Sequence, residues 1–168
     1  NKLGGVTGWT VGTDIKKTWT FSPPHGKVVA ISGRPAHDPI ASIGRVLGDR
    51  AVLYKYFTPN LALLTALSST TLTMFLIDAV TGSVLHTSTH SGILTSSPIS
   101  SIVSENWFAY TFTVANPESK AVSTQLIVSE LYESAVPNDR GSLSARTNYS
   151  SFGPDASARP HVMSAAFS

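Results

Sequence analysis

The sequence Phe75-Leu-Ile-Asp78-Ala-Val-Thr81-Gly82-Ser-Val-Leu85 contains two apolar runs separated by a compact turn. We predict that it forms a β-hairpin. Asp78 can accept hydrogen bonds from backbone N–H groups of the turn, and Thr81 can add a second side-chain-to-backbone bond. Gly82 supplies a positive φ without steric cost. This pattern favours a structural role in the turn for all three residues over a ligand role for Asp78.

Similar apolar runs recur along the chain at a spacing of about ten residues and are rich in β-branched and aromatic side chains. Trp107, Tyr110 and Tyr132 lie in alternating runs and are therefore assigned to the core. The only helix that the sequence favours is a short one beginning near Pro160. We expect strands over Lys27–Ser32, Ala51–Phe57, Leu61–Leu67, Leu72–Asp78, Ser83–Thr89, Asn106–Val114 and Thr124–Tyr132. Repeated hairpins predict an all-β antiparallel meander, as in propeller blades or, alternatively, a β-sandwich.

Composition narrows the function classes. The chain has 168 residues, of which 42% are hydrophobic and 13% charged, and it has no cysteine. Disulfides, thiolate zinc sites and cysteine nucleophiles are therefore excluded. The net charge is only +2 and the basic residues are scattered, so we expect no nucleic-acid binding. The longest apolar runs are far below the roughly 18–20 residues that span a bilayer, so no membrane span is expected in this segment.

The sequence has no motif that predicts catalysis. It contains no nucleophile elbow, P-loop or dinucleotide-binding glycine motif, and its few carboxylates form no acid–base pair. His86 and His90 would lie about 13 Å apart on one face of a strand, which is too far for one metal ion. We therefore assign no catalytic, cofactor-binding or metal-binding residue, and an enzyme is not expected.

Two stretches do not fit the meander. Residues Gly33–Gly48 contain two prolines and predict a long connection, and residues 134–160 predict a long polar loop, an exposed excursion that could be disordered. Within that loop, Asn148-Tyr-Ser150 is an acceptor sequence for N-glycosylation, so Asn148 is a candidate glycosylation site.

Four blocks of sequence, taken together, resemble one family. The blocks are Gly44-Arg-Val-Leu-Gly-Asp-Arg-Ala-Val-Leu-Tyr-Lys55 with Pro59-Asn60-Leu61, Phe75–Gly82 with Val84-Leu85-His86, Ile102-Val-Ser-Glu-Asn-Trp107 with Tyr110, and Glu130-Leu-Tyr-Glu133. In this order and spacing they are similar to the C-terminal lumenal region of subunit 1 of the endoplasmic reticulum (ER) membrane protein complex. The strand–DxxTG–strand unit resembles the blade hairpin of quinoprotein-like β-propellers. Substitutions within the blocks and short, Ser-rich loops suggest a divergent, fungal member.

The resemblance implies that residues 1–168 form a single lumenal β domain, with partial quinoprotein-like propeller blades, cut from a larger single-pass membrane protein. It implies a non-enzymatic scaffold module of a complex that inserts tail-anchored and multipass proteins into the ER membrane. The implied partners are the other subunits of that complex and its client membrane proteins. The family has no catalytic residue or cofactor in this region, so none is carried over. In the ER lumen Asn148 would be accessible to N-glycosylation, and the domain would then be a glycoprotein.

Two functions from other classes stay open at this point. A ligand- or quinone-binding propeller enzyme predicts a bound cofactor or metal in the purified protein. A carbohydrate-binding or adhesion β domain predicts that the isolated domain binds glycans.

Overall fold

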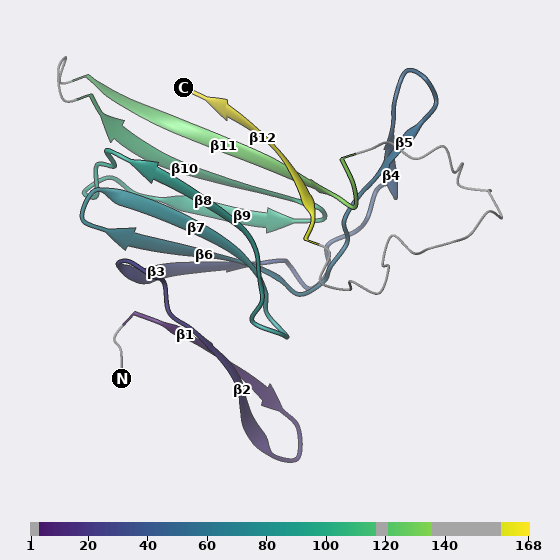
Figure 1. The fold of residues 1–168 in the computed structure, drawn as a ribbon, viewed down its shortest axis with the longest axis horizontal. Helices are drawn as coiled ribbons and strands as arrows, with labels where there is room; N and C mark the ends of the chain where they lie inside the picture. The colour runs from purple at the N-terminus through teal and green to yellow at the C-terminus, as the bar shows by residue number, and fades with distance from the viewer. Residues whose placement is uncertain (1–3, 117–120, 136–158) are drawn as a thin grey trace.

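The protein is described here by a computed structural model that covers residues 4–116, 121–135 and 159–168. Within these residues the chain forms β-strands and no helix (Figure 1). All strand pairing is antiparallel, so the predicted all-β class and antiparallel meander are confirmed. The strands are β1 (Val6–Val11), β2 (Ile15–Phe21), β3 (Lys27–Gly33), β4 (Gly44–Val46), β5 (Val52–Tyr54), β6 (Leu61–Ser68), β7 (Thr71–Asp78), β8 (Val84–Ser91), β9 (Ser100–Ser104), β10 (Trp107–Ala115), β11 (Val122–Tyr132) and β12 (His161–Phe167).

Two four-stranded sheets form the body of the molecule. Strands β3, β6, β7 and β8 are neighbours in this order and are called the central sheet below. Strands β9, β10, β11 and β12 form the second sheet, called the terminal sheet. The hairpin of β4 and β5 is inserted between the first two strands of the central sheet, whereas β1 and β2 form a separate hairpin (Figure 1).

The central sheet is packed on both of its faces. On one face, Leu61, Leu63 and Leu72 share a core with Phe108 and Leu131 of the terminal sheet. On the other face, a second core forms under the β1–β2 hairpin. That core contains Ala62, Leu64, Ala66, Phe75 and Ile77, with Val6, Trp19 and Phe21 of the hairpin packed against it. A β-sandwich has one core between its two sheets. Three stacked layers with two cores therefore favour the predicted series of blades over the sandwich.

The predicted strands are present, with changed bounds at several ends. Strand β5 covers only Val52–Tyr54 of the expected Ala51–Phe57. The long connection Gly33–Gly48 is interrupted by the short strand β4. The expected strands do not include β1, β2 or β9.

The helix expected near Pro160 was wrong. Residues His161–Phe167 form β12, which pairs in unbroken register with Leu126–Tyr132 of β11. The helix-favouring residues Met163 and Ala165 are outweighed by this pairing, because tertiary context routinely overrides a weak local preference. Most of the predicted loop at 134–160 lies outside the described residues.

The aromatic residues assigned to the core divide between two environments. Tyr110 and Tyr132 are almost completely buried, which confirms their assignment. Trp107 is half-buried, and it lies beside Glu130 in the register, on the opposite face of the terminal sheet from the buried Phe108. Among the described residues, no helix has the length and apolar character that crossing a membrane requires.

Candidate interaction site at one end of the sheets

The four blocks that carry the family resemblance meet at one end of the two sheets. At this end β6 begins and β7 ends, since Leu61 pairs with Asp78. The Pro59-Asn60-Leu61 part of the first block contacts the DxxTG block there. The backbone N–H of Ala79 donates a hydrogen bond to the carbonyl oxygen of Asn60 at 2.8 Å. The register therefore gathers residues that are far apart in sequence.

A shielded ion pair joins the first block to the third. Lys55 Nζ lies 2.9 Å from Glu105 Oε1, and the two side chains are only 15% and 13% exposed. The same oxygen accepts a hydrogen bond from the backbone N–H of Ala41 at 3.1 Å. A charge pair shielded from water interacts more strongly than an exposed pair and is less screened by salt. Glu105 is held in the left-handed region, with φ 41°, in the turn between β9 and β10.

A second ion pair ties the loop after β3 to the same turn. Arg34 Nε lies 2.9 Å from Asp38 Oδ2, and Ser104 Oγ donates to Asp38 Oδ1 at 3.0 Å. The backbone N–H of Glu105 also donates to the Asp38 carboxylate. That backbone hydrogen bond, together with those from Arg34 and Ser104, lowers the pKa of Asp38 below its ordinary value. We call Arg34, Asp38, Lys55, Ser104 and Glu105 the polar cluster.

Backbone bonds join the first block to the fourth. The N–H of Tyr56 donates to the carbonyl oxygen of Leu131 at 3.0 Å, and the N–H of Glu133 donates to Tyr54 at 2.9 Å. The Nδ2 amide of buried Asn106, from the third block, donates to the same Leu131 oxygen at 2.9 Å. Three blocks therefore share one backbone junction, and the base of the β4–β5 hairpin is fixed to the end of β11.

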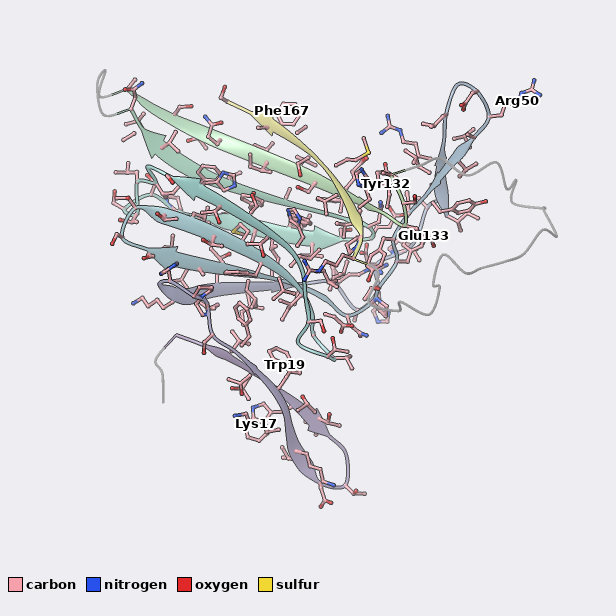
Figure 2. All side chains as sticks on the ribbon, viewed as in Figure 1. Lys17, Trp19, Arg50, Tyr132, Glu133 and Phe167 are labelled. Atoms are coloured by element: carbon pink, nitrogen blue, oxygen red, sulfur yellow. The ribbon has the colours of Figure 1, made fainter. Side chains whose placement is uncertain are left out.

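The β4–β5 hairpin projects from this junction into solvent. Figure 2 shows Arg50 at its tip, directed away from the body of the protein. The tip is ordered by its own bonds, since Leu47 N–H donates to Ala51 at 2.9 Å and Asp49 Oδ1 accepts from Ala51 N–H at 3.0 Å. Val46 is among the most exposed large apolar side chains. An anchored hairpin with an exposed apolar residue and an exposed cation is suited to docking another protein.

The predicted turn residues lie between β7 and β8. Asp78 Oδ1 accepts from Val80 N–H at 2.8 Å, and Thr81 Oγ1 accepts from Ser83 N–H at 3.2 Å. Gly82 has φ 75°. None of the three belongs to the polar cluster. Asn148, the candidate glycosylation site, lies outside the described residues.

The sequence reading missed the partner of this turn. Trp19 Nε1 donates to the carbonyl oxygen of Ala79 at 2.9 Å, and a Cβ atom added to Gly82 would come within 2.6 Å of the Trp19 ring. Gly82 is therefore needed for close approach as well as for its φ. The alternating sequence Trp19-Thr-Phe21 was the available signal, because it places both aromatic rings on one face.

The two histidines of β8 lie at the interface of the sheets. His90 Nε2 is 2.7 Å from Tyr110 Oη and 3.1 Å from Ser88 Oγ. The His90 ring also lies 4.5 Å from the Phe112 ring, centroid to centroid. Burial lowers the pKa of both His86 and His90. Within the described part of the chain, no group of three metal-ligating residues is present.

Comparison with known proteins assigns the family. A family model described as "ER membrane protein complex subunit 1, second beta-propeller" matches residues 1–168, in agreement with the expected propeller blades. The chain is 33% identical over 138 residues to ER membrane protein complex subunit 1 of Schizosaccharomyces pombe, which covers 80% of the chain and 15% of that relative.

Two further relatives carry the same name. Identity is 35% over 141 residues to the Saccharomyces cerevisiae protein, covering 81% of the chain and 18% of the relative. It is 33% over 170 residues to the Xenopus laevis protein, covering 95% and 16%. The chain thus spans less than a fifth of each relative's length. By sequence and by fold, this chain belongs to the family of ER membrane protein complex subunit 1.

Proposed function

We propose that this chain is a non-enzymatic scaffold module of the ER membrane protein complex, held in the ER lumen as part of a single-pass membrane protein. In this proposal the complex inserts tail-anchored and multipass proteins into the ER membrane, and the chain contributes a rigid platform for other subunits. The observation that carries the proposal is the convergence of the family's blocks on the anchored, projecting β4–β5 hairpin.

The contacts of the polar cluster support a structural role for its charges. Asp38 accepts bonds from Arg34, Ser104 and the Glu105 backbone, and Glu105 accepts from Lys55 and the Ala41 backbone. These ion pairs and hydrogen bonds fix the loop after β3 and the end of β5 to the β9–β10 turn. At the hairpin tip, by contrast, the side chains of Val46 and Arg50 are exposed and can meet a partner. The described contacts add no observation in favour of the quinone-binding enzyme or the carbohydrate-binding domain.

The test is co-purification of complex subunits with the tagged full-length protein. The double change Val46→Asp and Arg50→Glu should reduce recovery of other subunits of the complex at least fivefold, because it places negative charge where an apolar and a cationic side chain now stand. Recovery is measured by quantitative mass spectrometry, and thermal unfolding of the variant should be unchanged.

A matched control makes the same changes on the β1–β2 hairpin. Val11→Asp with Lys17→Glu alters an exposed valine and an exposed cation and should leave recovery of the subunits unchanged. The scaffold proposal fails if the unsubstituted protein recovers no other subunit of the complex. The assignment of docking to the β4–β5 hairpin fails if its variant recovers them as well as the control does.

A further inference from the structure

The β4–β5 hairpin has two chemically different faces. Arg45 pairs with buried Leu53 in the register, and its guanidinium lies 3.6 Å from Glu130 of β11, so this face is turned toward the body of the protein. Val46 pairs with Val52. Because successive side chains of a strand point to opposite faces, these two valines lie on the other face. We define the outer ribbon face as Val46, Val52 and Tyr54.

The outer ribbon face is an accessible apolar surface of fixed shape. Val46 is 69% exposed, and Val52 and Tyr54 are half-buried. The Val52 side chain lies over Gly44, where an added Cβ would come within 2.6 Å of Val52 Cγ1. The missing side chain at Gly44 therefore lets Val52 pack flat on the ribbon. An ordered apolar surface on a projecting hairpin is suited to the core of a protein–protein contact.

Arg50 occupies a strained backbone position at the tip of this hairpin. Its φ is 69°, in the left-handed region that glycine and asparagine adopt more readily than arginine. Gly48, in the same turn, does not have a positive φ. The sequence thus places a long cationic side chain where glycine would relieve the strain. Strain of this kind is typical of positions whose side chain is needed for function.

The Arg50 guanidinium is open to a partner. Figure 2 shows the side chain directed away from the body of the protein, and among the described residues it has no ion-pair partner. The neighbouring cations are each paired with a carboxylate, namely Arg34 with Asp38, Arg45 with Glu130 and Lys55 with Glu105. Arg50 can therefore receive a carboxylate from outside, which a guanidinium binds through two parallel hydrogen bonds.

Both ends of the hairpin are ordered before a partner binds. At the tip, the Arg50 N–H donates to the carbonyl oxygen of Leu47 at 3.0 Å, and at the base the Lys55 N–H donates to that of Ile43 at 3.1 Å. Lys55 also pairs with Tyr132 at the end of β11. A surface that is ordered in advance loses less conformational freedom on binding. These bonds therefore favour recognition of a partner by a preformed shape.

We propose that Arg50 and the outer ribbon face bind an acidic and apolar surface of another subunit of the complex. In this contact a partner carboxylate receives the Arg50 guanidinium, and aliphatic or aromatic side chains of the partner pack on Val46, Val52 and Tyr54. The inference rests on the scaffold role proposed above and adds the chemistry of the partner.

The charges of the hairpin favour a protein partner over a lipid surface. Docking to an anionic membrane uses clusters of about four to eight Lys or Arg. Strands β4 and β5 and their turn contain only Arg45 and Arg50 as cations, together with Asp49, and Arg45 is already paired with Glu130. One open guanidinium beside an apolar face fits a single carboxylate in an apolar setting.

Substitution at position 50 separates recognition from the stability of the hairpin. Arg50→Gly and Arg50→Asn both suit the left-handed backbone and remove the guanidinium. In the tagged full-length protein, each should reduce recovery of other subunits about fivefold or more, whereas hydrogen exchange at the hairpin amides should be no faster than in the unsubstituted protein. Arg50→Lys keeps the charge without the two-pronged geometry and should give an intermediate recovery.

The matched control changes the arginine on the opposite face of the same hairpin. Arg45→Gln should leave recovery within about twofold of the unsubstituted protein, because it lies outside the proposed contact. The proposal is overturned if Arg50→Gly and Arg50→Asn recover the subunits as well as this control does. It is also overturned if their recovery falls only together with faster exchange at the hairpin amides, since the hairpin shape and not the guanidinium would then be responsible.

Carbodiimide crosslinking identifies the partner, because the reagent joins an amine to a carboxylate in direct contact. In the complex purified with Arg50→Lys, an amide should form between position 50 and an Asp or Glu of another subunit, located by mass spectrometry. No crosslink at this position, or crosslinks only to a second copy, to the same polypeptide or to phosphatidylserine, overturn the proposal. The scaffold role fails separately, when the unsubstituted protein recovers no other subunit.

Discussion

The central and terminal sheets have four antiparallel strands each, yet they differ in how they are covered. Every residue from Leu61 to Ala66 in β6 is buried, because the terminal sheet packs on one face and the β1–β2 hairpin on the other. In β11, buried and more accessible residues alternate over most of the strand. The same strand geometry therefore gives a continuous run of buried residues in β6 and an alternation of buried and accessible residues in β11.

The difference shows that the accessible side chains of the terminal sheet are not all polar, as those of a solvated sheet face normally are. Its accessible residues include Ile102, Leu126, Met163 and Phe167, whereas a solvated sheet face would carry polar residues at such positions. This face therefore mixes apolar residues with polar ones such as Ser100, Thr111 and Glu130, whereas β6 of the central sheet is buried almost throughout.

The largest effect is expected from leucine truncation on the two comparable faces. Leu64 is fully buried under the β1–β2 hairpin, and Leu126 on the accessible face of the terminal sheet is 37% exposed. In the 168-residue chain, Leu64→Ala should lower the free energy of unfolding by about 2–5 kcal/mol. Leu126→Ala should lower it by less than about 1 kcal/mol. Urea denaturation of both variants measures the difference. Equal losses in the 168-residue chain would contradict the different burial of the two faces.

Glycine substitution tests the contact that joins the β1–β2 hairpin to the central sheet. Gly82 and Gly92 have nearly the same φ, 75° and 73°. A Cβ on Gly82 would meet the Trp19 ring, whereas one on Gly92 would meet nothing within 4 Å. Gly92→Ala should cost about 1–2 kcal/mol from backbone strain, and Gly82→Ala about 1–3 kcal/mol more from the clash. Thermal unfolding gives both values, and equal losses would show that the Trp19 contact is unimportant.

A stabilising change is expected in the layer between the two large sheets. Thr65 on β6 is buried, and its Oγ1 atom has no hydrogen-bond partner among the described residues. Thr65→Val keeps the shape and removes the unsatisfied hydroxyl, so the free energy of unfolding should rise by about 1 kcal/mol. The melting temperature should rise by about 2–4 °C. A lower melting temperature would mean that the hydroxyl has a partner in solution.

The smallest effect is a pH dependence that originates in the same layer. Burial lowers the pKa of His86 and His90 below the ordinary value of 6.5. The unfolded chain therefore binds protons before the folded protein does as the pH falls below about 6.5, and stability should decrease over that window. Replacing both residues, His86→Gln with His90→Gln, should flatten the dependence in urea titrations between pH 7 and 5. An unchanged slope would place its origin elsewhere.

Much of the fold could be predicted because apolar runs and turn residues are local signals. The hairpin around Asp78, Thr81 and Gly82 was assigned from eleven consecutive residues. By contrast, β12 was mistaken for a helix, since Met163 and Ala165 favour helix locally and only the pairing with β11 makes them a strand. The long loop at 134–160 and Asn148 stay predictions, because most of that stretch lies outside the described residues.

The candidate site was less predictable than the fold. The four family blocks could be quoted, but Lys55 and Glu105 are fifty residues apart and form an ion pair only because β5 and β9 end at the same place. Asp38 lies in a stretch assigned only as a connection, and its partner Ser104 is distant in sequence. The role of Trp19 beside Gly82 was equally hidden, since no sequence spacing reports a contact across layers.

The amino-acid sequence alone determined the all-β class, the antiparallel hairpins and the family, because strand periodicity, turn chemistry and ordered sequence blocks are read along the chain. The meeting of the four blocks beneath one projecting hairpin depends on the tertiary structure. So does the packing of the central sheet, whose two faces each contribute to a separate core among the described residues. The physical reason is that register and layer stacking are set by the joint burial of side chains from distant strands, which no local pattern encodes.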